Sequence, residues 1–155
     1  MLKKFCIVYF FRNPHRENYS IEELFNNIIQ QVSKTNKSKV YRLKYKSKGI
    51  INRINGLIET YKNKGGINHI TGDIHFIAIS LPRNNTVLTI HDIAILKRTK
   101  GFKKAVIKYL WYTLPAKRVK YITVISEFTK RELLSEIKVN SDKVKVIPNP
   151  VSPLI

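Results

Sequence analysis

Short apolar runs alternate along this chain with segments in which apolar residues recur at helical spacing. Residues 5–11 are continuously apolar, as expected for a strand that is covered on both faces. Further strands are predicted at residues 39–45, 67–71, 86–90, 121–125 and 143–147. Because strands and helices alternate, we expect an α/β fold, a Rossmann-like open parallel sheet with helices on both faces.

The predicted helices carry recognisable start and stop signals. Ser20 and Glu23 form a capping box before a helix with apolar residues at strict helical spacing, namely Ile21, Leu24, Phe25, Ile28, Ile29 and Val32. A second helix stops at Gly65-Gly66 and carries one apolar stripe, made of Ile50, Ile51, Ile54, Leu57, Ile58 and Tyr61. Asp73 is placed to cap a helical turn, and Ser126 to cap a helix over residues 127–137.

Length and composition suit one globular domain. The chain has 155 residues, of which 43% are hydrophobic, and this excludes wholesale disorder. Cys6 is the only cysteine, so there is no disulfide framework, and its apolar surroundings predict a buried, inert thiol. The apolar N-terminal run is too short to span a bilayer and lacks a cleavage site. We therefore expect a cytoplasmic protein.

Charge is the outlying property. The chain has 29 Lys and Arg residues against 10 Asp and Glu residues, which gives a net charge of +19. A field this positive favours anionic partners, such as nucleic acid, an acidic lipid surface or phosphorylated small molecules.

Three of the predicted strands stop abruptly at polar groups. These groups are His91-Asp92, Ser126-Glu127 and Asn149. In an open parallel sheet, ligands bind outside the carboxyl ends of the strands, so these side chains are expected to share one edge.

The last seventy residues resemble a known family. The order VLTIHD, basic helix, ITVISEFTKREL and DKVKVIPNPV is similar to the N-terminal half of a GT-B glycosyltransferase of the retaining family 4 type, and residues 69–81 and 12–25 are similar to it as well. The resemblance implies an acceptor-binding domain over residues 1–147 and the start of an interdomain linker over residues 148–155. It also implies a C-terminal donor-binding domain, to which nothing in this sequence corresponds. We expect that domain to act in cis or in trans and the chain alone to be inactive.

The resemblance also implies roles for the strand ends. A histidine at the position of His91 faces the donor sugar and is the catalytic candidate, since a neutral imidazole can donate to a sugar hydroxyl or a phosphate oxygen. The alternative is a polar pair that solvates a loop. Asp92 either orients that loop or binds acceptor hydroxyls. Ser126 and Glu127 begin a helix that can receive a diphosphate, although structural capping is the favoured role.

The loop after the first strand departs from the family. Related enzymes often carry a glycine pair there, whereas this chain has Arg12, Asn13, Pro14 and His15. The departure suggests that the side chain of Arg12 or His15 contacts phosphate, or that the loop binds the acceptor. Gly72 and Asp73 complete the predicted substrate-binding set. No histidine or cysteine spacing indicates a metal site, and no cofactor is expected besides the nucleotide-sugar co-substrate.

The segment over residues 96–120 concentrates the basic charge. On a helical wheel the expected core stripe consists of Phe102, Ala105, Val106, Tyr109 and Leu110. The opposite side carries Lys103, Lys104 and Lys108, with Ile107 and Trp111 between them. Such a face is typical of a helix at an anionic membrane surface. The alternative is that Trp111 packs under a neighbouring loop and the lysines are solvated.

The resemblance implies an enzyme of the hexosyltransferase type that is active in polysaccharide biosynthesis, and the basic face with its apolar pair favours a peripheral location on the inner membrane face. It would move a sugar from a nucleotide-sugar donor to a glycan or lipid-linked acceptor. A basic doubly wound module that binds nucleic acid is an alternative, but the sequence contains no recognisable motif for it. An inactive remnant of a truncated glycosyltransferase is another.

Overall fold

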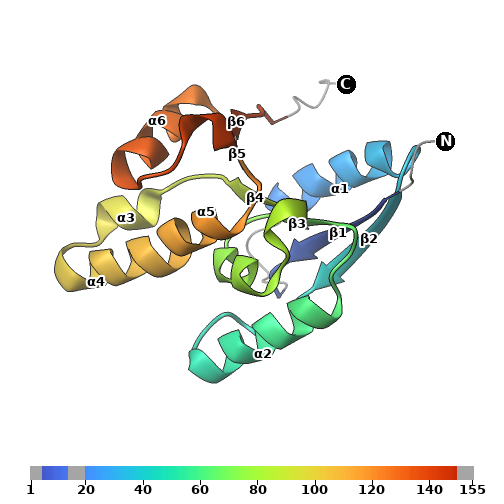
Figure 1. Cartoon of the computed structure of the whole chain (residues 1–155), viewed down its shortest axis with the longest axis horizontal. Coiled ribbons are helices and arrows are strands. Elements are labelled where there is room, and N and C mark those ends of the chain that lie inside the picture. Colours follow the sequence, from blue (N-terminus) through green and yellow to red (C-terminus); the bar gives the residue numbers. More distant parts are fainter. Residues whose placement is uncertain (1–4, 14–19, 150–155) are drawn as a thin grey trace.

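Six parallel strands form one open sheet in a computed structural model of the chain, which describes residues 5–13 and 20–149 (Figure 1). The strand order is β2-β1-β3-β4-β5-β6. The strands are β1 (Cys6–Phe11), β2 (Lys37–Arg42), β3 (Ile67–Ile70), β4 (Thr86–Ile90), β5 (Tyr121–Val124) and β6 (Val144–Val146). The predicted fold class is confirmed.

The strand order changes direction at β1. Tyr9 of β1 pairs with Val40 of β2 on one side and with His69 of β3 on the other. The chain therefore leaves β1 toward one edge of the sheet and then returns past it to build the rest. In open α/β sheets this switch point is where a crevice forms beyond the carboxyl ends of the strands.

Helices cover both faces of the sheet. On one face lies α1 (Ser20–Val32), whose Phe25 is buried against Tyr9 and Phe11. On the other face the main core gathers residues from the sheet and from the connections after β2. Those connections are α2 (Ile50–Lys62), η1 (His75–Ser80), η2 (Arg83–Asn85), α3 (Ala94–Arg98), α4 (Gly101–Ile107), η3 (Lys108–Thr113), α5 (Leu114–Arg118), α6 (Glu127–Glu136) and η4 (Ser141–Lys143).

Helix α2 does not bury its apolar stripe. Its buried residues are Gly56 and Thr60, and Leu57 is the stripe residue that packs against the core. Because Gly56 has no side chain, the helix approaches the ring of Phe76 closely, and a Cβ built at Gly56 would lie 3.5 Å from that ring. The contact face is thus built from small residues. The other stripe residues are exposed, namely Ile50, Ile51, Ile54, Ile58 and Tyr61.

The long helical segment after β4 is rotated relative to the prediction. The expected core stripe is exposed at Phe102, Ala105, Val106, Tyr109 and Leu110. Ile107 and Trp111, expected on the outer face, pack against the core instead. The segment packs on η1, where the Trp111 ring contacts Phe76 and the Trp111 carbonyl accepts from His75, so the face with Ile107 and Trp111 is turned to the core.

Two smaller predictions were wrong. Cys6 is exposed, because β1 reaches the surface at its first residue. Asp73 caps no helix, since η1 begins after Ile74 without a side-chain cap and the Asp73 carboxylate binds Arg12 instead. Among the described helices, none is long and apolar enough to cross a membrane.

Candidate functional site

The carboxyl ends of β1, β3 and β4 bring several predicted site residues together. Arg12 follows β1, and its Nη1 donates to Oδ2 of Asp73 at 2.8 Å. Thr71 follows β3, and its backbone N–H and its hydroxyl both donate to the carbonyl of Phe10, at 3.2 and 2.9 Å. These bonds fix the loop after β3 against the end of β1.

His91 is held at this edge by one defined hydrogen bond. Its Nε2 lies 2.8 Å from the carbonyl oxygen of Thr71, and because a carbonyl can only accept, Nε2 carries the proton. The edge of the ring lies beside Gly72, where a Cβ would be 3.6 Å from Cδ2 of His91. In the neutral imidazole, Nδ1 is then an acceptor, which is suited to a sugar hydroxyl rather than to a phosphate oxygen.

Asp92 orients the loop that follows β4. Its Oδ1 accepts from the backbone N–H of Ala94 at 2.8 Å, at the start of α3. The residue is exposed at the sheet edge. The structural role proposed for Asp92 is therefore present, and one carboxylate oxygen is not committed to that bond.

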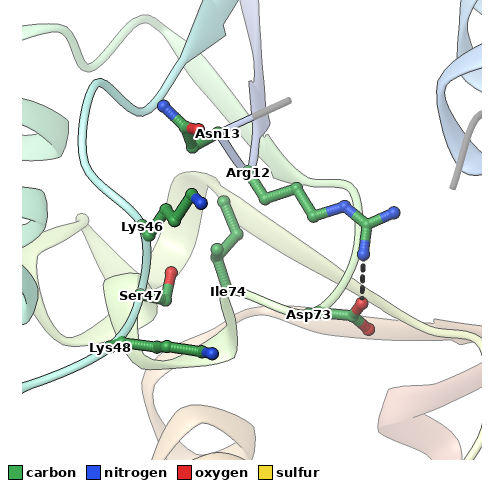
Figure 2. A pocket seen from close by; sticks show the side chains of 7 residues that line it. All are labelled: Arg12, Asn13, Lys46, Ser47, Lys48, Asp73 and Ile74. Carbon is green, nitrogen blue, oxygen red and sulfur yellow. Dashed lines mark hydrogen bonds and ion pairs between the residues drawn. The ribbon is translucent and has the colours of Figure 1, made fainter. Parts of the chain in front are cut away.

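A pocket of about 190 Å³ opens beside Arg12 (Figure 2). It is lined by Arg12, Asn13, Lys46, Ser47, Lys48, Asp73 and Ile74. Asn13 closes one side, because its amide donates to the carbonyls of Leu43 and Lys44 at 3.2 and 2.8 Å. The Asn13 amide group therefore holds the segment after β2 in place and does not serve to bind a substrate.

The sequence alone did not indicate Lys46, Ser47 and Lys48. They lie in the connection between β2 and α2, where no strand-end motif marks them. The parallel sheet places the end of β2 next to the end of β1, so this loop lies at the same edge as Arg12. Within the described residues, Lys46 and Lys48 form no ion pair, and they bring positive charge to the pocket.

Sequence reasoning also missed Glu22. It lies in the first turn of α1, where its Oε1 is 3.6 Å from Nε of Arg12. Its Oε2 is buried and has no hydrogen-bond partner among the residues that the structure describes. A small cavity of about 10 Å³ lies between Glu22, Gly72 and Asp73. A carboxylate oxygen in that position can accept a bond from a hydroxyl group.

The remaining predicted residues lie apart from the pocket. Ser126 caps α6, with its hydroxyl oxygen accepting from the backbone N–H of Thr129 at 3.1 Å, and Glu127 is exposed in the first turn. Neither residue lines the pocket beside Arg12. His15 lies outside the described residues. Within the described ranges, no group of three or more His, Cys, Asp and Glu side chains could hold a metal ion.

Two further histidines stabilise the interior. Nε2 of His69 lies 2.8 Å from the hydroxyl of Thr89, which in turn lies 2.7 Å from the hydroxyl of Thr123. Burial, together with the neighbouring His91, lowers the pKa of His69 to about 4. Burial also lowers the pKa of His75, whose Nδ1 donates to the carbonyl oxygen of Trp111. Both rings are therefore neutral near pH 7.

The profile of Glycosyltransferase Family 4 matches residues 67–153. The chain belongs to glycosyltransferase family 4. This confirms the resemblance on which the site residues were predicted, and it makes the chain a glycosyltransferase-like module with a GT-B type Rossmann-like sheet. No curated protein shows a significant match to the chain.

The family 4 match covers only part of the site. It begins at β3 and includes Gly72, Asp73, His91 and Asp92. Arg12 and the β2–α2 loop lie before it, so the similarity predicted for residues 12–25 stays a prediction. The pocket is thus built from family 4 positions on one side and from residues outside the match on the other.

Proposed function

We propose that this domain binds the acceptor of a transferase that moves a sugar from a nucleotide-sugar donor to a glycan or lipid-linked acceptor. The observation that carries the proposal is the meeting of Arg12, Asp73 and His91 at the carboxyl edge of a family 4 sheet, beside a pocket. Ligands of open α/β sheets bind at this edge.

The chemistry of the pocket suits an acceptor with both hydroxyl and anionic groups. Asp73 offers carboxylate oxygens to hydroxyls, and Lys46 and Lys48 offer ammonium donors to a phosphate or carboxylate. Arg12 lies in the same pocket and is held in place by the carboxylates of Asp73 and Glu22. An anionic acceptor would be held at its charged end by the β2–α2 loop.

His91 has a role next to the transferred sugar in this proposal. With its Nε2 proton committed to Thr71, the neutral ring accepts a hydrogen bond from a sugar hydroxyl at Nδ1. Transfer also requires stabilisation of the departing diphosphate by preorganised cations and donors. By the family resemblance, most of these groups belong to a donor-binding domain, which we expect to act in cis or in trans.

The transfer itself is tested with the domain joined to, or mixed with, a donor-binding domain. Single nucleotide-sugars are offered with glycan and lipid-linked acceptors, and products are identified by mass spectrometry. His91→Ala is expected to lower kcat by about 100-fold or more, with a smaller change in the KM for acceptor. His69→Gln is the control, because that ring is bound within the interior. Failure to form product with every donor contradicts the proposed function, and an unchanged kcat removes His91 from the mechanism.

The acceptor pocket is tested separately with the 155-residue chain. Binding of phosphorylated and neutral sugars is followed by NMR in the wild type and in Lys46→Gln/Lys48→Gln. We expect this variant to lose affinity for the phosphorylated sugar alone. The matched control is Lys37→Gln/Lys39→Gln, which removes two exposed lysines from the edge strand β2. Equal losses in both variants would show general charge attraction rather than a pocket.

A further inference from the structure

Two neighbouring helices expose an unusual amount of apolar surface. Ile50 and Ile51 of α2 are each 75% exposed, and Phe102 of α4 is 86% exposed. With the exposed residues that follow them on α2, on α4 and on the adjoining η3, they form what we name the apolar surface: Ile50, Ile51, Ile54, Ile58, Phe102, Val106 and Leu110. Contiguous apolar patches on a domain surface mark sites of interaction with proteins or membranes.

A groove lies along the part of this surface that follows β4, and from α2 it is lined by Arg53. The guanidinium carbon of Arg53, on α2, lies 4.4 Å from the centre of the Trp111 ring, on η3. A groove of about 560 Å³ lies there, with a lining formed by Arg53, Ile95, Phe102, Lys103, Val106, Ile107, Leu110 and Trp111. Figure 1 shows α2 and α4 with their N-terminal ends on the same side of the molecule. The exposed side chains Ile50, Ile51 and Phe102 all lie near these ends.

The charge that flanks the apolar surface is mainly positive. Residues 93–118 contain no Asp or Glu, and the single carboxylate of α2, Glu59, accepts from the hydroxyl of Tyr41 and the N–H of Lys44. Lysines flank both helices at Lys48, Lys62, Lys100 and Lys103, and within the described residues none of them forms an ion pair.

Other lysines of the segment are already neutralised. Lys104 and Lys108 bind the two carboxylate oxygens of Glu136 at 2.8 and 3.3 Å, and Lys97 binds Glu132. These contacts are made with α6. The sequence predicted a membrane-facing set of three lysines with Ile107 and Trp111. Of those lysines, Lys103 is the one that stays unpaired at the rim of the groove among the described residues, while Ile107 and Trp111 lie at its base.

We propose that the apolar surface docks on an anionic lipid bilayer. Apolar side chains would enter the boundary between headgroups and acyl chains, and the flanking lysines would contact acidic headgroups, as interfacial helices do. A second copy of this chain would bring the same cations to the contact, and like charges oppose that pairing. An acidic bilayer complements both the apolar and the basic part.

The proposal rests on the surface alone and not on the sugar chemistry. Docking through this surface would nevertheless place the pocket beside Arg12 close to the membrane, because Lys46 and Lys48 of that pocket lie directly before α2. A lipid-linked acceptor would then reach the pocket from the membrane plane without leaving the bilayer.

Binding of the 155-residue chain to vesicles tests the proposal. The vesicles contain phosphatidylcholine alone or with phosphatidylglycerol, at an ionic strength where the screening length is about 8 Å. Co-sedimentation gives the partition coefficient, and emission of Trp111, the single tryptophan, reports entry of lipid into the groove. We expect binding to the anionic vesicles, with a blue shift of the emission.

Matched variants separate this surface from general charge attraction. Ile50→Ser/Ile51→Ser and Phe102→Ser are each expected to lower the partition coefficient at least about tenfold. Phe128→Ser on α6 is the apolar control, since that side chain is 59% exposed and lies outside the surface. Lys100→Gln/Lys103→Gln is expected to cost about fivefold for each lysine, which is what 1 kcal/mol per lysine corresponds to. The edge-strand variant Lys37→Gln/Lys39→Gln serves as its control.

Three results would overturn the proposal. They are an absence of binding to anionic vesicles, an equal loss in test and control variants, and self-association that disappears in Ile50→Ser/Ile51→Ser while vesicle binding does not change. The last result would assign the surface to a protein partner. Because all of these substitutions replace exposed side chains, circular dichroism is expected to show unchanged folding in each variant.

Discussion

The buried imidazole of His75 donates from Nδ1 to the carbonyl oxygen of Trp111, 2.8 Å away. Pro115 explains why this donor is needed. Proline has no N–H, so it cannot donate to the carbonyl four residues earlier, which is that of Trp111. His75 lies in η1, and it thus supplies the hydrogen bond that Pro115 cannot make within its own helical segment.

Replacing His75 by Phe keeps an aromatic ring but removes the donor. We expect a loss of about 1–3 kcal/mol in the free energy of unfolding, the cost of an unpaired buried carbonyl. Urea titration of the wild type and His75→Phe measures this loss. Adding Pro115→Ala supplies a backbone N–H, and the loss caused by His75→Phe is expected to be smaller in that background. An equal loss in both backgrounds would show that the two residues are not coupled.

Stability should depend on pH through His69. Its pKa is about 4 in the folded chain, below its ordinary value of 6.5, so the unfolded chain binds more protons between these values. Stability is therefore expected to fall as the pH falls from about 6.5 to about 4, by at most about 1.4 kcal/mol per pH unit. His69→Gln should flatten this dependence, measured as the urea midpoint against pH. An identical slope in the variant would refute the assignment.

The glycine pair after α2 offers a comparison between adjacent positions. A Cβ at Gly65 would lie 2.6 Å from Cγ2 of Val8 and 2.9 Å from the carbonyl oxygen of Cys6, whereas a Cβ at Gly66 would meet nothing closer than 3.6 Å. We expect Gly65→Ala to destabilise the domain by about 1–3 kcal/mol, as overpacking does. Gly66→Ala should have a much smaller effect in the same thermal or urea titration. Similar effects at both positions would contradict the packing described at β1.

The tautomer of His91 is directly observable. Because Nε2 donates to the carbonyl of Thr71, the neutral ring should carry its proton at Nε2 and a lone pair at Nδ1. Nitrogen-15 shifts of the imidazole distinguish the two tautomers in the labelled chain at neutral pH. A proton at Nδ1 would mean that the bond to Thr71 is absent, and the proposed acceptor role of Nδ1 would fail with it.

Removal of the Ser126 cap should weaken α6 without affecting the pocket. Ser126→Ala is expected to cost about 1 kcal/mol of unfolding free energy, because the N–H of Thr129 loses its acceptor. Binding of a phosphorylated sugar to the pocket should not change. Ser135→Ala is the control, since that exposed serine lies in the last turn of the same helix. A loss of sugar affinity in Ser126→Ala would instead place α6 in the substrate site.

The sheet and the strand ends could be predicted because each depends on local pattern. Continuous apolar runs followed by His91-Asp92 or Ser126 identified the strands and one shared edge. The faces of two helices could not be predicted. In α2 the packing face consists of Gly56 and Thr60, so hydrophobicity pointed to the wrong side. In the segment from α4 to α5 the buried face is the one that packs on η1, through the contacts of Trp111 with His75 and Phe76, and a helical wheel does not show such distant contacts.

The candidate site, too, has features that could be predicted from the sequence and features that could not. His91 and Asp92 directly follow β4 and Asp73 lies in the short loop after β3, so their positions were predictable from sequence order. The contacts that decide their roles join residues far apart in the chain, such as Arg12 with Asp73 and His91 with Thr71. Lys46 and Lys48 enter the site only because β2 pairs with β1, which is a property of the sheet topology.

The two outer strands of the sheet determine how copies of this domain can associate. β2 exposes Lys37 and Lys39 along its length, and β6 is three residues long with Lys145 exposed at its centre. Unpaired strand edges are templates for intermolecular β-pairing, and lysines and short strands oppose it. Aggregates of the folded domain should therefore form through helical contacts, keep native strand content and dissolve with detergent, rather than grow as cross-β fibrils.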